Sequence, residues 1–411
     1  MRQLHRRVVV TGLGILSPIG NTVHEAWSSC INGHSGITNV DVGIVDSPVS
    51  IGGQLKNFNP SDHLEPKEVR RIDPFIQYGI IAANQSIADS GILNFPNLNK
   101  ELVGVNFGAG IGGIQTIENN KLLLESKGYK KVSPFFVPGS IVNMISGLVS
   151  IKHGFMGPNT SVVTACSTGN HCIGTAARSV ACGEADVMIA GGAEMASTPL
   201  SISGFIAARA LSTNPDPKTA CRPWDIDRDG FILSDGAGSL VLEEYEHAKM
   251  RGAHIYAEVA GFGMSSDAYH MTAPPEDGRG ASLSMKNALL DAELNSDDID
   301  YINAHGTSTP LGDLAETRAV KTIFGYSAPS ISSTKSMTGH TLGAAGAIES
   351  IFCIKSINDN VVPPTINLTN PDPLCDLDYT PLRAVEKEVS IAMNNSFGFG
   401  GTNSTLVFKK I

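Results

Sequence analysis

The sequence predicts an α/β fold built from two similar units, and three observations support this. Apolar runs typical of β-strands alternate with helical segments along the chain. A weak internal repeat relates residues 164–180 to residues 333–351, since both segments read as a strand end, a polar turn, Thr-Gly and a helix. No Pro- or Ser-rich linker interrupts the chain. Two packed copies of one α/β unit therefore account for the 411 residues.

The strands are expected where β-branched and apolar residues cluster, and the helices where apolar residues recur with helical spacing. The predicted strands cover residues 7–13, 102–108, 160–165, 185–192, 238–244, 256–263, 299–306, 330–335, 389–396 and 404–410. The predicted helices include residues 75–91, 172–183, 280–294 and 314–325.

The N-terminus resembles a signal peptide only superficially. Arg2, Arg6 and Arg7 precede an apolar run, but Thr11, Gly12 and Gly14 break that run and no cleavage site follows. A first strand is therefore expected there. The charge-free stretch 133–151 is interrupted by proline, glycine and asparagine, so no membrane span is expected.

Charge and cysteine content narrow the class of protein. The net charge of -10 argues against a nucleic-acid binder. Charged residues make up 17%, below the ~25% of an average soluble domain, which indicates a large core or a surface buried against a partner chain. The seven cysteines contain no CxxC pair, and the histidines lack zinc-ligand spacing. A reduced, cytoplasmic protein is expected.

Cys166 is the candidate nucleophile. It ends the predicted strand 160–165 and precedes a helical pattern rich in alanine and glycine. The positive end of a helix dipole favours a thiolate, so the thiol pKa is expected to fall. Nearby backbone N–H groups could hold an oxyanion. An inert buried cysteine is the alternative, and Cys172, Cys182 and Cys353 are interpreted as such packing residues.

His305 and His340 differ from the other histidines because each lies at a predicted strand-to-helix turn, as Cys166 does. The carboxyl ends of strands carry the sites of open α/β sheets. A catalytic pair is therefore expected. Two structural histidines and a metal-binding pair are the alternatives.

Two Gly-rich segments are interpreted differently. Residues 108–113 match G-x-G-x-x-G, but no acidic residue follows at a second strand end, so dinucleotide binding is not expected. Residues 394–403 lie between two predicted strands and expose backbone N–H groups beside Phe399, which suits a second oxyanion donor.

Four segments together resemble the signature blocks of the β-ketoacyl-acyl carrier protein (ACP) synthases, and of their type II condensing enzymes in particular. They are TACSTG around Cys166, NAHGTSTPLGD around His305, STKSMTGHTLGAAG around Lys335 and His340, and NSFGFGGTN. The resemblance covers nearly the whole chain. It implies the thiolase fold, with two duplicated halves, residues 1–255 and 256–411, in five layers (α-β-α-β-α), and a homodimer.

The resemblance also implies residue roles. Cys166 would accept an acyl chain from acyl-ACP, and His305 and His340 would stabilise the enolate formed from malonyl-ACP as carbon dioxide leaves. The N–H groups of Cys166 and Phe399 would hold the oxyanion, and Phe399 would gate the thiol. Lys335 would order the site, together with Glu349. No cofactor is required, because decarboxylation itself makes the nucleophile.

Further residues match the family's binding positions. Thr307 and Thr309 match its pantetheine-binding hydroxyls, while Ile111, Phe205 and Phe136 match substrate-binding positions. The implied ACP-docking residues are basic: Lys67, Arg70, Arg71, Lys130, Lys131 and Arg209. The implied ligands of a structural monovalent cation are Asn303, Ala304, Glu349, Asn395 and Ser396, although Glu349 could instead only pair with Lys335.

Two other functions compete with fatty-acid condensation. A non-catalytic partner of the same fold would lack the cysteine, and Cys166 is present. A ketosynthase that serves polyketide carrier proteins stays open. Acyl chain-length preference and the division of roles between the two histidines are not determined by the sequence.

Overall fold

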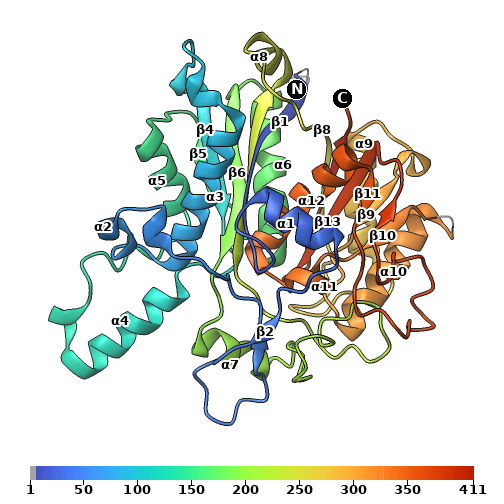
Figure 1. The fold of residues 1–411 in the computed structure, drawn as a ribbon, viewed down its shortest axis with the longest axis horizontal. Helices are drawn as coiled ribbons and strands as arrows, with labels where there is room; N and C mark the ends of the chain where they lie inside the picture. The colour runs from blue at the N-terminus through green and yellow to red at the C-terminus, as the bar shows by residue number, and fades with distance from the viewer. Residues whose placement is uncertain (1–5, 327) are drawn as a thin grey trace.

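A single ten-stranded mixed sheet dominates the computed structural model, which describes residues 6–326 and 328–411 (Figure 1). The strand order is β10-β9-β13-β14-β8-β1-β7-β6-β4-β5. Five strands come from the N-terminal half: β1 (Val8–Leu16), β4 (Val103–Gly108), β5 (Asn159–Thr160), β6 (Val187–Glu194) and β7 (Gly236–Glu244). Five come from the C-terminal half: β8 (Ala257–Ser266), β9 (Tyr301–Asn303), β10 (Ser330–Ser332), β13 (Ile391–Gly398) and β14 (Thr402–Lys409).

The two halves repeat one order of elements. The first half contains, between its strands, α3 (Pro74–Ser90), α5 (Met144–His153) and α6 (Thr168–Ala181). The second half contains α9 (Arg279–Asp291), α10 (Pro310–Phe324) and α12 (Ala345–Asp359) at the corresponding places. Strands β1 and β8 join the halves through the antiparallel pairs Val9–Glu258 and Val10–Ala257. The predicted α/β fold with two duplicated halves is confirmed, and we propose that the division falls between residues 255 and 256.

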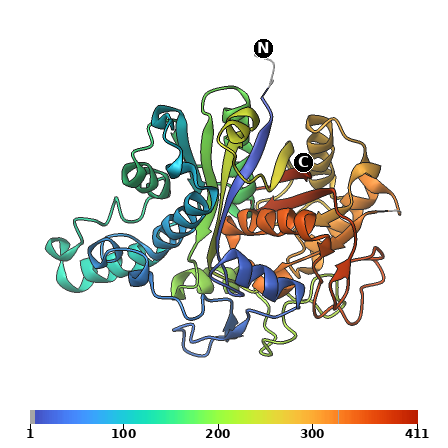
Figure 2. The ribbon, with the colours of Figure 1, turned by 45° about the horizontal axis from the view of Figure 1, so that its top comes forward.

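The helices form layers around the strands. Helices α6 and α12 pack against each other and lie between the two halves, with α6 against β6 and α12 against β13 and β7. Helix α3 covers β1, β7 and β6, while α9 covers β8 and β14 (Figure 2). The N-terminal and C-terminal strands of the sheet thus lie on either side of α6 and α12, which gives the predicted α-β-α-β-α succession with the site near the central helices.

Helix α3 illustrates how the sequence sets these elements. The side chain of Asp73 accepts the N–H of Phe75, Pro74 occupies the first turn, and Gly91 ends the helix at φ 63°. Residues Phe75, Ile76, Ile80 and Ile87 are buried in the core beneath the N-terminal strands. Capping and an apolar face thus both specify the helix.

The remaining elements surround this framework. They are α1 (Val23–Ile31), β2 (Thr38–Asn39), β3 (Ile51–Gly52), α2 (Pro66–Val69), α4 (Ile114–Lys127), α7 (Pro199–Ala207), α8 (Tyr245–Met250), α11 (Lys335–Thr338), β11 (Val361–Val362) and β12 (Val385–Glu386). Helix α4 extends away from the body at the left of Figure 1. Across the described ranges, we find no helix whose length and apolar character would let it cross a membrane. Arg2, named above, lies outside those ranges.

The strand predicted at 160–165 is wrong in most of its length. Strand β5 ends at Thr160 after pairing with Val105 and Asn106 of β4. The next ladder groups, on Phe107, are used by side chains: its N–H donates to Ser146 Oγ at 2.9 Å and its carbonyl accepts from Ser161 Oγ at 2.6 Å. Residues 161–164 therefore leave the sheet and turn inward. The predicted strand 330–335 likewise ends at Ser332, before α11.

Candidate active site

Cys166 lies in a single 3₁₀ turn, Ala165–Ser167, directly before α6. Ala165 has φ 48°, a left-handed conformation that is costly for a residue with a Cβ, so the chain turns sharply there. Ser167 Oγ fixes the turn by donating to the carbonyls of Ser396 and Thr402, both at 2.8 Å. Contacts between the two halves of the chain therefore hold Cys166 in place.

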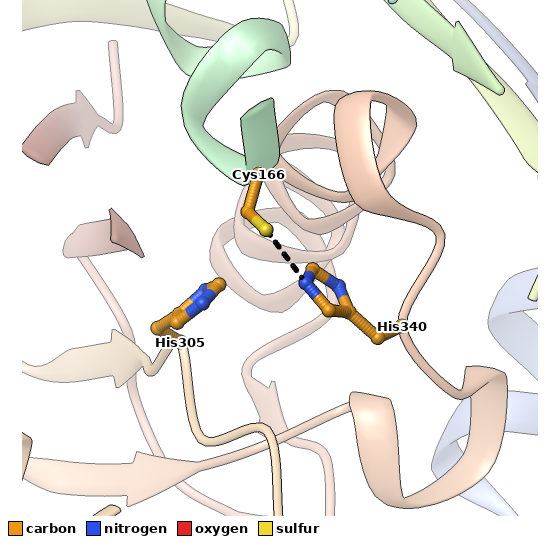
Figure 3. A group of neighbouring side chains, drawn as sticks. All are labelled: Cys166, His305 and His340. Atoms are coloured by element: carbon orange, nitrogen blue, oxygen red, sulfur yellow. Dashed lines mark hydrogen bonds between the residues drawn. The ribbon is translucent and has the colours of Figure 1, made fainter. Parts of the chain in front are cut away.

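Two histidines lie beside the Cys166 sulfur (Figure 3). His340 Nε2 is 3.0 Å from Cys166 Sγ, and the ring centroids of His305 and His340 are 5.3 Å apart at 84°. His305 follows β9 by two residues. His340 lies in a turn between two helices, α11 and α12, rather than at the predicted strand-to-helix turn. Its N–H donates to the Ile232 carbonyl, and its carbonyl accepts the N–H of Ser234. The three residues meet although they are 139 and 35 positions apart in sequence.

The same three side chains are also a plausible set of ligands for a soft metal ion. One potential ligand atom from each lies within 4.8 Å of the others. Zinc accepts sulfur and imidazole ligands in this combination. Geometry alone therefore allows either a nucleophile flanked by two imidazoles or a metal site.

The expectation that the Cys166 pKa falls is wrong. Burial raises the pKa of this thiol to about 12, against lowering contributions from Lys335 and from the backbone N–H groups of Phe399 and Cys166 itself. Desolvation of the thiolate outweighs the helix end because the sulfur is enclosed. The thiol is therefore protonated at rest, and its proton needs an acceptor. His340 Nε2 is in position to be that acceptor.

The two imidazoles are neutral at pH 7. Burial, and then the charge of Lys335, lower the pKa of His305 and of His340 well below the usual value. Lys335 is itself buried and forms an ion pair with Glu349 of α12. A buried cation beside two histidines disfavours a second positive charge, which keeps the rings available as neutral donors or acceptors.

The Gly-rich turn between β13 and β14 brings a second backbone donor to the sulfur. The backbone N–H groups of Phe399 and of Cys166 itself act on Cys166 Sγ and lower the pKa of its thiol. Gly400 and Gly401 have φ 87° and 69°, conformations that suit glycine. The Phe399 side chain is partly exposed and lines the cavity described next. The arrangement suits an oxyanion hole.

A cavity of about 500 Å³ opens onto Cys166, His305 and His340. Ile111 and Phe205 line it, as do Thr307 and Thr309, whose hydroxyls are 3.0 Å apart. Phe136 does not line the cavity and lies, partly buried, in the segment before α5. Four of the five predicted substrate-binding residues are thus brought to one cavity. Its size is typical of ligand pockets.

The residues predicted to hold a cation come from three elements that pack against one another, β9 with the residue after it, β13 and α12. Asn303 ends β9, Ala304 follows it, Asn395 and Ser396 belong to the adjacent β13, and Glu349 belongs to α12. All five are buried. Asn303 Oδ1, Glu349 Oε2 and Ser396 Oγ have no hydrogen-bond partner among the described residues. Oxygen atoms left unpaired in a buried site are what a hard cation would satisfy.

The basic residues predicted to dock the carrier protein are exposed. Lys67 belongs to α2, Arg70 and Arg71 follow it, and Lys130 and Lys131 end a short 3₁₀ turn after α4. Arg71 stacks on the Phe135 ring at 4.5 Å, which brings the first cluster close to the segment after the second. Arg209 lies at the cavity itself.

Sequence reasoning missed three residues that support the site. Glu316 accepts the N–H groups of His305 and Gly306 at 2.9 and 2.8 Å. Phe231 packs edge-on against His340, with ring centroids 5.2 Å apart. Glu194 contacts the cavity wall. It ends β6, two residues beyond the predicted strand 185–192, so the rule about carboxyl ends of strands indicated this region but not this residue.

Family models and known proteins match this chain over nearly its whole length. The family described as "Beta-ketoacyl synthase, N-terminal domain" matches residues 5–248, and "Beta-ketoacyl synthase, C-terminal domain" matches residues 256–369. The chain is 54% identical to a 3-oxoacyl-[acyl-carrier-protein] synthase 2 of Vibrio harveyi, with 99% of each chain covered. It is 50% identical to the protein of that name in Staphylococcus aureus, again over 99% of each.

Solved structures agree. A β-ketoacyl synthase from Burkholderia phymatum STM815 superposes with a TM-score of 0.93 at 35% identity, over 99% of this chain and 100% of that one. A type II polyketide ketosynthase, solved with its acyl-carrier protein and a bound hexaketide, gives a TM-score of 0.91 at 35% identity, with 99% of each chain covered.

Proposed function

The chain belongs to the β-ketoacyl synthase family, and from this premise we propose how its residues carry out the reaction. It is an acyltransferase of fatty-acid elongation that joins acyl-ACP and malonyl-ACP to give β-ketoacyl-ACP, carbon dioxide and ACP, through an acyl-Cys166 intermediate. The observation that carries the residue assignment is the 3.0 Å contact between Cys166 Sγ and His340 Nε2 at the base of the cavity.

In the first half-reaction, Cys166 takes the acyl chain. The sulfur attacks the thioester carbonyl of acyl-ACP, and His340 Nε2 accepts the thiol proton that the raised pKa leaves in place. The backbone N–H groups of Cys166 and Phe399 hold the oxyanion. The bond to the pantetheine sulfur then breaks, and the proton passes from His340 to that leaving thiol.

In the second half-reaction, malonyl-ACP replaces the released carrier. The bond to its carboxylate breaks, carbon dioxide leaves, and the electron pair forms an enolate that His305 and His340 stabilise by donating hydrogen bonds from neutral rings. His340 donates after its ring proton has exchanged from Nδ1 to Nε2, because Nε2 is the acceptor in the first half-reaction. The carbanion attacks the Cys166 thioester, a carbon–carbon bond forms, the bond to the Cys166 sulfur breaks, and the thiolate that leaves takes up one proton from the solvent. Decarboxylation supplies the nucleophile, so the proposal needs no cofactor.

The condensation itself tests this function. Purified enzyme mixed with acyl-ACP and malonyl-ACP should release carbon dioxide and β-ketoacyl-ACP in equal amounts. Carbon dioxide without the condensed product would mean that the chain only decarboxylates. Neither product would contradict the proposal.

A polyketide ketosynthase is the second candidate, supported by the structural similarity reported above. The identities favour fatty-acid synthesis, since they are 50–54% toward 3-oxoacyl-ACP synthases 2 and 35% toward the polyketide enzyme. The presence of Cys166 argues against a non-catalytic partner subunit.

We propose that the exposed basic residues dock the carrier protein. This chain carries a net charge of -10, so an acidic carrier needs a local basic surface to approach it. Reversing Lys67, Arg70 and Lys131 to glutamate should raise KM for acyl-ACP about tenfold while leaving KM for a small acyl-pantetheine nearly unchanged. The difference should shrink at high salt, because salt screens exposed charges. Equal losses with both substrates would assign these residues to the fold or the channel instead.

We also propose a structural monovalent cation at Asn303, Ala304, Glu349, Asn395 and Ser396, supported by the unpaired buried oxygens there. It would order the loops below the two histidines, without entering the chemistry. Crystals grown in rubidium should show an anomalous peak at this place, and Asn303→Ala should remove the peak. Density and distances of a water molecule in the unmodified enzyme would leave Glu349 as a partner of Lys335 only.

We propose a homodimer that forms along the β5 edge. Strand β5 is the last strand of the sheet, and exposed apolar side chains lie around it, including Ile151, Met156 and Val163. Phe136 lies in the segment leading to α5 rather than at the cavity of its own chain. The substrate-binding role predicted for Phe136 therefore requires a second copy.

We also propose a cytoplasmic location, because all seven cysteines are free thiols, as is usual in a reducing compartment.

A further inference from the structure

Glu194 is a buried carboxylate that four backbone amides surround. It is the last residue of β6 and has no exposed surface. Its two oxygens accept the N–H groups of Gly110 at 2.5 Å, Ile111 at 3.1 Å, Gly112 at 3.0 Å and Gly343 at 3.1 Å. The amides of the G-x-G-x-x-G segment are thus occupied within the protein. Burial raises the pKa of the Glu194 carboxyl to about 7, and the four amides oppose this rise because they favour the charged form. Four hydrogen bonds to one buried side chain make the arrangement a firm anchor.

Glu194 joins three segments of the chain, which are the end of β6, residues 110–112 and residues 342–343. A Cβ on Gly343 would lie 2.3 Å from the Gly110 nitrogen, and a Cβ on Gly110 would lie 2.8 Å from a Glu194 oxygen. Only glycine fits at both positions. Ile111, held through its own N–H, and Leu342, next to Gly343, both line the cavity that opens onto Cys166. Leu342 keeps a left-handed φ of 47°. Glu194 therefore bonds directly to the backbone of two stretches of the cavity wall.

The reacting groups are held by other contacts. The backbone of His340 bonds to Ile232 and Ser234, at 2.8 and 3.0 Å. Cys166 is fixed through Ser167, which donates to the carbonyls of Ser396 and Thr402. Loss of the Glu194 anchor should consequently loosen the wall at Ile111 and Leu342 more than it moves Cys166 or His340.

We propose that Glu194 is a positioning residue that fixes the Ile111 wall of the cavity and so determines which acyl chains reach Cys166. This inference rests on the proposed function, because it assumes that the cavity receives the acyl chain. Glu194 does not touch the reacting atoms. It acts through the turn at 110–112, and its effect is on discrimination between acyl chains rather than on the chemical step.

The Glu194→Gln variant tests the proposal. Glutamine has nearly the same size, but its NH₂ group donates, and it must face two of the four amide donors because each Glu194 oxygen accepts two of them. We expect the ratio of kcat/KM for tetradecanoyl-ACP to that for hexanoyl-ACP, measured for acyl transfer to Cys166, to change about tenfold. The rate of malonyl-ACP decarboxylation without an acyl donor should stay within about threefold, since that step does not use the wall. Glu194 also raises the pKa of the Cys166 thiol, which affects transfer of both acyl chains equally. Taking the ratio of the two kcat/KM values cancels this common effect.

Asp300→Asn is the matched control. The Asp300 carboxylate also accepts two backbone amides, those of Ser390 and Ile391, but it lies away from the cavity. The ratio of kcat/KM for tetradecanoyl-ACP to that for hexanoyl-ACP should be the same in Asp300→Asn as in the unmodified enzyme. Should Glu194→Gln fail to fold, Glu194→Asp keeps the charge, shortens the reach and should shift the ratio in its place. An unchanged ratio in the folded variant, or a fall in decarboxylation as large as the change in transfer, would overturn the proposal. Absence of any acyl transfer in the unmodified enzyme would instead contradict the proposed function.

Discussion

Replacing Cys166 with serine is expected to abolish the acyl-enzyme and to lower condensation by at least about a thousandfold. The sulfur lies 3.0 Å from His340 Nε2, and the N–H groups of Cys166 and Phe399 lower the pKa of its thiol. A hydroxyl is a far weaker nucleophile than a thiol, and neither His340 nor the backbone N–H groups compensate for that loss. Mass spectrometry of the intact protein after incubation with acyl-ACP measures the adduct directly.

Cys172→Ser is the control for this result. Cys172 lies six residues further along, inside α6, where it is fully buried and packs in the helix. Burial raises the pKa of its thiol to about 12, as it does for Cys166, so thiol pKa alone does not separate the two residues. Position separates them, because only Cys166 opens onto the cavity. An adduct on the Cys166→Ser protein, or on another cysteine, would reject the assignment.

The fold was predictable because the sequence pattern is local. Runs such as 102–108 and 238–244 alternate with amphipathic helices, and the observed strands β4 and β7 follow them closely. The strand at 160–165 was not predictable in the same way. Its residues favour a strand, yet side chains of Ser146 and Ser161 occupy the ladder groups of Phe107. Ser161 belongs to that segment, but its partner Phe107 and the competing Ser146 lie elsewhere in the chain, and a local pattern does not show such competition.

The sequence predicted which residues form the candidate site, but it did not predict the pKa of the Cys166 thiol. Cys166, His305 and His340 each stand at a turn after a strand or helix, and signature blocks mark them. The thiol pKa depends on how completely the sulfur is enclosed, which only the packing of both halves determines. Glu194 and Glu316 were missed for a similar reason. Their partners are backbone amides, and a sequence does not record which amides a carboxylate will face.

The raised thiol pKa predicts different roles for the two histidines. Among the described residues, Cys166 Sγ is hydrogen-bonded to His340 and not to His305. His340→Ala should therefore slow acyl transfer to Cys166 by about a hundredfold, because the thiol loses its proton acceptor. His305→Ala should leave acyl transfer within about tenfold of the unmodified rate. Both variants should lose decarboxylation of malonyl-ACP by about a hundredfold or more, since each removes a donor to the enolate.

Single-turnover acylation and malonyl-ACP decarboxylation, measured separately on the two variants, distinguish these roles. His153→Ala is a suitable control. His153 is the last residue of α5, its ring bonds to Asn84, and it does not line the cavity. If His305→Ala slowed acylation as much as His340→Ala, proton transfer from Cys166 would have to involve both rings. If His340→Ala acylated at the unmodified rate, the thiolate would form without His340, and the lowering contributions of Lys335 and the backbone N–H groups would then have to exceed the desolvation that opposes them.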